Sequence, residues 1–203
     1  MRVFNMAYYC DVRFWFDLNL KRYVQNTHER YEKNHCMKNY LWIFFVLSPL
    51  SYGVSFEEGQ KCLSQNDYSC ALREFKPLAE NGDARAQYMI GMMRAKGDGF
   101  KQDYVEAVAW YRKSAEQGFP IPQNHLGVMY EHGRGVKKEF SEAVIWYRKA
   151  AEKGYSLAQF NLGMMYEQGK GIDQSYPEAL KLYRESAKKG LSTAQLNLGA
   201  MYE

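Results

Sequence analysis

The sequence predicts an all-α fold made of stacked helix pairs, and the main observation is a period of 36 residues. The small residues that mark this period are Gly91, Gly127, Gly163 and Gly199, then Gly82, Gly118, Gly154 and Gly190, and then Ala107, Ala143 and Ala179. A fixed period of this length is typical of a repeat protein, in which one unit cannot bury its apolar face alone and stacks on its neighbours.

One helix of each unit is indicated by a stripe of small and aromatic residues. Within residues 141–153 these are Ala143, Trp146, Tyr147, Ala150 and Ala151, at the i, i+3, i+4, i+7, i+8 spacing of one helix face. The alanines allow a neighbouring helix to approach closely, while the two rings fill the space beside them.

The preceding segment, 124–132, predicts the partner helix of the pair. It carries Leu126, Gly127, Met129 and Tyr130 at similar spacing. A glycine inside a helix costs about 1 kcal/mol, so we interpret Gly127 as the point where the two backbones are closest. Each unit is therefore predicted to be an antiparallel helix pair.

The residues between these segments are those that end and begin helices. Paired glycines occur at 97–99, 133–135 and 169–171. They follow the first helix of each pair, where left-handed C-cap residues are needed. Asp103 with Glu106, and Ser175 with Glu178, have the spacing of a capping box at the start of the second helix.

This pattern resembles the Sel1-like repeat, a relative of the tetratricopeptide repeat. The matching stretches are AQ-x-x-x-G-x-M-Y-x-x-G-x-G at 158–171 and EA-x-x-W-Y-R-x-x-A-x-x-G at 142–154, and the pattern recurs in register over roughly 56–203. The resemblance implies a right-handed superhelical solenoid of antiparallel helix pairs that binds proteins or peptides.

We divide the chain accordingly. The predicted segments are an upstream extension outside the fold (1–36), a signal peptide (37–55), an atypical tetratricopeptide-like capping unit (56–82), three Sel1-like repeats (83–119, 120–155 and 156–191) and the first helix of a truncated repeat (192–203).

The predicted signal peptide begins at Met37, which we interpret as the true start of translation. A lysine follows it, then the apolar run 41–50, and then small residues that suit cleavage after Gly53 or Ser55. The apolar run is shorter than the roughly 20 residues of a transmembrane helix. Together with the resemblance, this predicts a bacterial protein that is periplasmic or secreted. The alternative is that 1–36 is a cytoplasmic extension and 41–53 a buried helix or a membrane anchor, the only membrane contact we expect.

Two cysteines, Cys62 and Cys70, lie in the capping unit on opposite sides of a short loop. In an exported protein they could form a disulfide that joins the two helices, which typically adds about 2–4 kcal/mol of stability. The alternative is a pair of reduced, packed cysteines. The other two, Cys10 and Cys36, belong to the predicted extension.

Charge and motifs argue against several classes of function. The net charge is only +4, with basic and acidic residues interleaved, which favours solvated helix faces over a nucleic-acid surface. His125 and His132 lie about 10 Å apart along one helix and cannot share a metal ion. The paired glycines follow helices instead of strands, unlike a phosphate-binding loop. We therefore expect no catalytic residues, no metal and no cofactor.

A partner-binding surface is implied by the resemblance, because in related arrays the first helix of each pair lines a concave groove. By position, the residues that would line it are Tyr88, Met92, Asn124, Val128, Glu131, Phe160, Met164 and Glu167. Aromatic and methionine side chains favour peptide contacts, and the two glutamates favour basic groups. The alternative is that Tyr88, Phe160 and the methionines belong to the core between repeats.

The function expected from these observations is an exported, non-catalytic scaffold for a protein or peptide partner. Two alternatives remain at this stage. One is an enzyme, since cysteine-rich relatives of the repeat are linked to β-lactamase or penicillin-binding activity, although those relatives carry a cysteine pair in every repeat. The other is a structural protein that self-assembles through the apolar face at 196–201.

Overall fold

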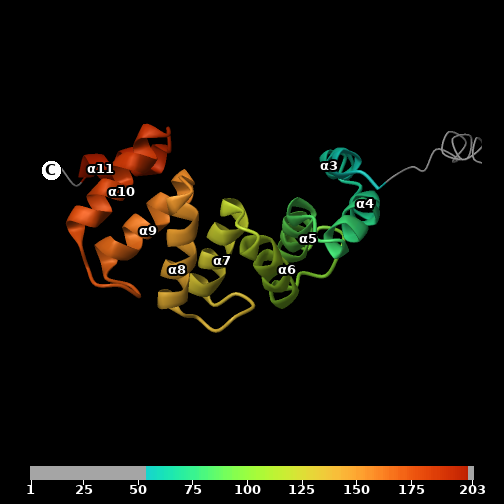
Figure 1. Ribbon diagram of the computed structural model, residues 1–203, viewed down its shortest axis with the longest axis horizontal. Coiled ribbons are helices and arrows are strands. Elements are labelled where there is room, and N and C mark those ends of the chain that lie inside the picture. The colour runs from blue at the N-terminus through green and yellow to red at the C-terminus, as the bar shows by residue number, and fades with distance from the viewer. Residues whose placement is uncertain (1–53, 201–203) are drawn as a thin grey trace, which may run out of the picture. The chain divides into compact units, whose positions relative to one another are not determined.

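The computed structural model describes residues 54–200, with residue 200 described by its backbone alone. Within this range there are nine α-helices, which Figure 1 shows following one another in chain order. They are α3 (Phe56–Ser64), α4 (Tyr68–Glu80), α5 (Ala84–Lys96), α6 (Tyr104–Glu116), α7 (Pro120–His132), α8 (Phe140–Glu152), α9 (Ser156–Gln168), α10 (Tyr176–Lys188) and α11 (Ser192–Ala200). The predicted extension 1–36 and the signal peptide up to residue 53 lie outside the described residues.

The helices pack as antiparallel pairs in sequence. Each of α3, α5, α7 and α9 packs on the helix that follows it, and each second helix packs on the first helix of the next pair. We call α3, α5, α7, α9 and α11 the first helices and α4, α6, α8 and α10 the second helices. The all-α class and the antiparallel helix pairs predicted from the sequence are confirmed.

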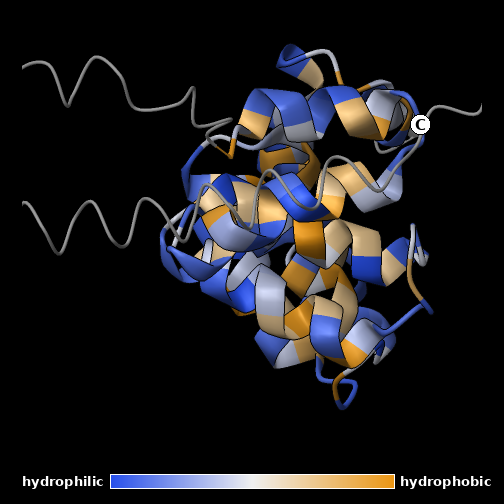
Figure 2. Cartoon of the chain, turned by 90° about the vertical axis from the view of Figure 1, so that its right-hand side faces the viewer, coloured by the Kyte–Doolittle hydropathy of each residue, from blue (hydrophilic) through white to orange (hydrophobic). Residues whose placement is uncertain are grey.

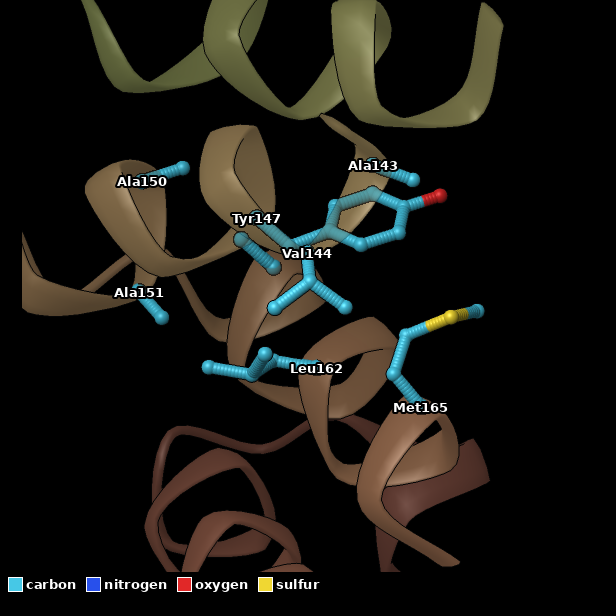
Figure 3. Close-up of a cluster of buried hydrophobic side chains, with 8 residues drawn as sticks. Ala143, Val144, Tyr147, Ala150, Ala151, Leu162 and Met165 are labelled. Atoms are coloured by element: carbon cyan, nitrogen blue, oxygen red, sulfur yellow. The ribbon is translucent and has the colours of Figure 1, made fainter. Parts of the chain in front are cut away.

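The core lies between successive helices, where the predicted alanine and aromatic stripe is buried. Figure 3 shows one part of it, where Tyr147 and Val144 of α8 lie against Leu162 and Met165 of α9. Figure 2 shows that hydrophilic residues lie mainly on the outward turns of the helices and in the connecting loops. Burial of this stripe is what holds each pair to the next.

The first helices α3, α5, α7 and α9 each carry a glycine beneath an aromatic ring of their own second helix. A Cβ atom placed on Gly127 would lie 2.4 Å from a ring carbon of Tyr147, closer than real contacts allow. The same arrangement joins Gly59 with Phe75, Gly91 with Tyr111, and Gly163 with Tyr183. The sequence predicts the closest approach of the two backbones at Gly127, but the atoms nearest to it belong to the buried ring of Tyr147.

This contact predicts opposite effects of one substitution at two equivalent positions. Gly127→Ala is expected to lower the free energy of unfolding by about 1–2 kcal/mol, because the added methyl group overpacks the Tyr147 ring. At Gly199 no described atom outside its own helix lies within 4 Å of an added Cβ atom. Gly199→Ala should therefore raise the free energy of unfolding by up to about 1 kcal/mol, through its higher helix propensity. Urea unfolding followed by circular dichroism measures both. A stabilised Gly127→Ala would contradict the packing described here.

The predicted helix ends are also present. The first helices α5, α7 and α9 end at glycines with φ of 84°, 68° and 63°, the left-handed conformation that suits glycine. The carboxylate of Asp103 accepts the backbone N–H of Glu106 at 2.9 Å at the start of α6, and α10 begins in the same way. These caps fix where each helix of a pair begins and ends.

Long polar side chains connect each repeat to the unit before it. Lys189 Nζ donates to the carbonyl of Gly154 at 2.5 Å, and Lys153 donates to the carbonyl of Gly118. A glutamine makes the equivalent bond one repeat earlier. A cation at the carboxyl end of a helix also interacts favourably with the helix dipole, so these bonds help to set the spacing between repeats.

The first unit carries the disulfide that the sequence left as one of two alternatives. Cys62 of α3 and Cys70 of α4 are bonded across the loop, and Cys62 is almost completely buried. Asp67 in this loop accepts the backbone N–H of Cys70 at 2.9 Å and so caps α4. The short first hairpin is therefore held by a covalent bond as well as by its core.

Within residues 54–200, every helix falls short of the length and apolar character needed to cross a membrane. The segment 41–53, proposed from sequence as an alternative anchor, lies outside the described residues.

Candidate functional site

Seven of the eight residues predicted to bind a partner lie half-buried on three consecutive first helices, α5, α7 and α9. They are Tyr88, Met92, Val128, Glu131, Phe160, Met164 and Glu167. With His125, which lies among them, they form what we call the first-helix surface.

Polar contacts hold the neighbouring first helices side by side. The hydroxyl of Tyr88 on α5 lies 3.2 Å from Nε2 of His125 on α7. One repeat further, Asn161 Nδ2 on α9 donates to Asn124 Oδ1 on α7 at 2.9 Å. Both contacts join a residue to the one 37 positions later, so the surface is continuous from α5 to α9.

Asn124, the eighth predicted residue, does not lie on this surface. It is only 2% exposed and is bonded to Asn161, so it does not line the accessible surface where the sequence placed it. It was predicted from its position three residues before Gly127, carried over from related arrays. The sequence signal for its burial is a second asparagine, Asn161, one repeat and one residue later. Two buried asparagines can satisfy each other's hydrogen-bonding groups.

Tyr88 and Phe160 are neither fully buried nor fully exposed. The ring centroids of Tyr88 and Tyr111 are 5.9 Å apart, and those of Phe160 and Tyr183 are 5.5 Å apart. Each therefore covers the buried tyrosine of its own repeat with one side and leaves part of its ring accessible.

His125 was not predicted as a site residue, yet it lies at the centre of an aromatic group. Its ring centroid is 5.2 Å from that of Tyr111 and 5.5 Å from that of Tyr88. Burial lowers the pKa of His125 below its usual value, and the positive charge of Lys96 lowers it further. Burial also raises the pKa of Tyr88, whose hydroxyl faces the imidazole. A neutral imidazole accepts a hydrogen bond from that hydroxyl, whereas the protonated ring offers no acceptor.

This arrangement predicts a pH dependence of stability. Because the pKa of His125 is lower in the folded state, the unfolded chain takes up the proton first as the pH falls below about 6.5. Stability is therefore complete above that pH and decreases below it, until the pH reaches the folded-state pKa. For a single proton the slope is at most about 1.4 kcal/mol per pH unit.

Urea unfolding at pH 8, 6.5 and 5 measures this loss in the wild type and in His125→Asn. Asparagine already occupies the equivalent position in the next repeat, at Asn161, so the variant is expected to fold. The wild type should lose more stability on acidification than the variant. Equal losses would show that His125 does not titrate in this way.

Two carboxylates on the first-helix surface are held by buried tyrosines. Tyr147 donates its hydroxyl to Glu131 Oε2 at 2.6 Å, and Tyr183 donates to Glu167 Oε2 at 2.6 Å. Burial first, and then the bond to the glutamate, raises the pKa of each tyrosine. Both tyrosines therefore stay protonated and act as fixed donors to the carboxylates.

These carboxylates stand where the helix itself does not favour them. Glu131 and Glu167 lie in the last turns of α7 and α9, where the partial negative charge of the helix dipole disfavours an acidic group by about 0.3–1 kcal/mol. Among the ion pairs of the described residues, none includes either glutamate. Within residues 54–200, the surface thus carries two oriented negative charges that no ion pair neutralises.

In the part of the chain that the structure describes, no three His, Cys, Asp or Glu side chains are grouped so as to hold a metal ion. The chemistry available on the first-helix surface is apolar contact, ring stacking and hydrogen bonding to two carboxylates.

Fold and surface together define a helical repeat protein with a row of accessible side chains along its first helices. The model of the Sel1 repeat matches residues 84–119, 123–155 and 156–191. The chain therefore belongs to the Sel1 repeat family.

Solved structures agree with this assignment. A protective antigen of uropathogenic Escherichia coli that displays the same repeat fold is 38% identical, with a TM-score of 0.70, over 72% of this chain and 32% of the antigen. A Sel1 repeat protein from Oxalobacter formigenes is 36% identical, with a TM-score of 0.68, over 71% of this chain and 59% of that one.

The cysteine rich protein B of Helicobacter pylori is 21% identical, with a TM-score of 0.50, over 63% of this chain and 92% of that one, and shares the fold. The chain thus spans about a third of the E. coli antigen and less than two thirds of the Oxalobacter protein. No curated protein matches the sequence.

Proposed function

We propose that this protein is a non-catalytic scaffold that binds a segment of a protein partner across its first-helix surface. The observation that carries the proposal is a contrast between positions within the repeat. The buried tyrosine of the second helix is the same in all three repeats, as Tyr111, Tyr147 and Tyr183. The half-buried positions of the first helix differ, with Met92, Val128 and Met164 at one and Ala95, Glu131 and Glu167 at another.

This contrast supports a binding role for a physical reason. Positions that only pack one repeat on the next meet the same neighbours each time, so the same residue suits them in every repeat. Half-buried positions that differ are free of that requirement. Methionine and aromatic side chains at such positions are typical of surfaces that bind peptides.

We further propose that the protein works in an oxidising compartment, the periplasm or the extracellular space. The disulfide between Cys62 and Cys70 supports this, because such bonds persist mainly in exported proteins. Mass spectrometry of the protein from the native host tests it. A mature N-terminus at residue 54 or 56 is expected, and peptides from residues 1–36 in the mature protein would contradict the proposed start at Met37.

Binding is tested by selecting phage-displayed random peptides on the purified protein and measuring their affinity for the double variant Tyr88→Ala/Phe160→Ala. We expect a loss of about tenfold or more. A matched control is Val105→Ala/Ile145→Ala, which removes exposed apolar side chains from two second helices and should leave binding unchanged.

Thermal melts of both double variants accompany the binding measurement. A Tyr88→Ala/Phe160→Ala protein that unfolds would assign these rings to the core, and equal affinity for all proteins would contradict the proposed surface. Hydrolysis of nitrocefin by the purified protein would contradict the non-catalytic part of the proposal.

A further inference from the structure

The two carboxylates of the first-helix surface are oriented by the protein at a helix end that does not favour their charge. Glu131 and Glu167 stand at the end of the helix that disfavours negative charge. Each is nevertheless held in place by a hydroxyl from a buried tyrosine. A side chain that is held in a fixed orientation where the local electrostatics disfavour its charge is typical of a functional site.

Each carboxylate has one oxygen oriented by the protein, and among the described residues the other oxygen accepts no hydrogen bond. In both cases Oε2 accepts the tyrosine hydroxyl, and the glutamate side chain is half-buried. A partly desolvated carboxylate attracts a cation more strongly than one on an open surface, because the local dielectric is lower. Lys and Arg side chains of a partner are the groups that complement it.

The apolar residues beside the carboxylates extend the same surface. Val128 lies one turn before Glu131 on α7, and Met164 lies one turn before Glu167 on α9. Both are half-buried. They are placed to contact the aliphatic stems of long basic side chains, whose charged ends then reach the carboxylates.

The repeat sets the distance between the two charges. The glutamates are equivalent residues on α7 and α9, which are joined directly by the Asn161–Asn124 hydrogen bond. Each of these two helices packs on α8 and they meet through this side-chain bond, so we take the separation of their axes as roughly 10 Å, the upper end of the range for neighbouring helices. A polyproline II segment rises about 3.1 Å per residue and completes a turn in three residues, so residues three apart lie on one face and about 9 Å from each other.

We propose that the first-helix surface around Glu131 and Glu167 binds an extended segment of a partner protein with two basic residues three positions apart. One basic side chain pairs with each glutamate, and the residues between them contact Val128 and Met164. This proposal rests on the proposed function, because it names the chemistry of the partner for that surface.

Three fluorescein-labelled peptides test the proposal by fluorescence anisotropy at low ionic strength, with the full chain. The first contains three Arg-Pro-Pro triplets. The second replaces each arginine with glutamine, and the third has the composition of the first but with its arginines adjacent. We expect the first to bind about tenfold more tightly than either of the others. Equal affinity for the first and third peptides would overturn the proposed spacing.

The protein variants are Glu131→Gln/Glu167→Gln and the control Glu116→Gln/Glu152→Gln. The control changes the net charge equally, at two exposed helix ends that also lie 36 residues apart. We expect the first variant to lose about tenfold in affinity for the spaced arginine peptide and the control to stay within about twofold. Equal losses in both would indicate nonspecific charge attraction and overturn the proposal, as would no loss in the first.

A thermal melt separates a binding role from a structural one. Glutamine still accepts the tyrosine hydroxyl; it weakens this charge-assisted bond but removes the unfavourable charge, so Glu131→Gln/Glu167→Gln should melt close to the wild-type temperature. A lower melting temperature together with unchanged binding would assign the carboxylates to stability.

The peptide selection on the wild type distinguishes failure of this inference from failure of the proposed function. Selected peptides that depend on Tyr88 and Phe160 but lack spaced basic residues would overturn the inference and leave the scaffold function in place. A selection that yields no peptide dependent on those rings would overturn both.

Discussion

Tyr147→Ala is expected to lower the free energy of unfolding by about 3–5 kcal/mol, the range for removing a large buried aromatic side chain. Tyr147 is completely buried, and its ring covers Gly127 on the first helix of its own repeat. It also packs in the cluster that joins α8 to α9 (Figure 3). The cavity would therefore affect one pair and its contact with the next. Chemical unfolding followed by circular dichroism measures the loss.

Two further variants define what the loss means. Tyr147→Phe keeps the ring and removes only the hydrogen bond to Glu131, so it should cost about 1 kcal/mol. Tyr176→Ala, at a position that is 56% exposed, should change stability by less than about 0.5 kcal/mol. If Tyr147→Ala cost no more than Tyr176→Ala, the ring could not be the central packing element of the repeat.

Cys62→Ser/Cys70→Ser is expected to lower the free energy of unfolding of the first unit by about 2–3 kcal/mol. The bonded cysteines are 8 residues apart, and closing a loop of that length restricts the unfolded chain by about this amount. α3 has only nine residues and follows no other described helix, so it depends strongly on its contact with α4. Trypsin cleavage after Lys61, compared between the two proteins, reports on unfolding of this unit.

A reductant provides the control for this prediction. Dithiothreitol should bring the wild type to the stability of the double variant and should leave the double variant unchanged. A reductant effect of equal size on both proteins would show that it does not act through this bond, and no difference between the proteins would mean that the disulfide contributes little to the first unit.

The repeat architecture could be predicted from sequence because packing between repeats uses the same residues each time. Gly127 and Tyr147 recur with their period, and the structure places the ring over the glycine. The helix ends could be predicted equally well, because Gly97 acts through local backbone geometry and Asp103 through a local hydrogen bond. Such features depend on residues that are close together in the sequence, so the sequence alone is enough to predict them.

The surface could be predicted only in part, because it depends on contacts between residues of different repeats. Asn124 has the position of a groove residue but is buried, and it is bonded to Asn161, a contact that the period alone does not reveal. His125 was considered only as a metal ligand, while its role depends on Tyr88 and Tyr111 from the preceding repeat. The fixed orientation of Glu131 comes from a tyrosine on the second helix of its own repeat, 16 residues away, which the period does not reveal either.

Photo-crosslinking tests the central claim, that partners bind across the first helices, most directly. A benzophenone-bearing amino acid is incorporated either in place of Val128 on α7 or in place of Ile145 on the outer side of α8, and a peptide selected on the wild type is added before irradiation. Val128 belongs to the first-helix surface, and Ile145 is 44% exposed. We predict a crosslink from position 128 and none from position 145. A crosslink from position 145 without one from position 128 would place the partner on the second helices and contradict the claim.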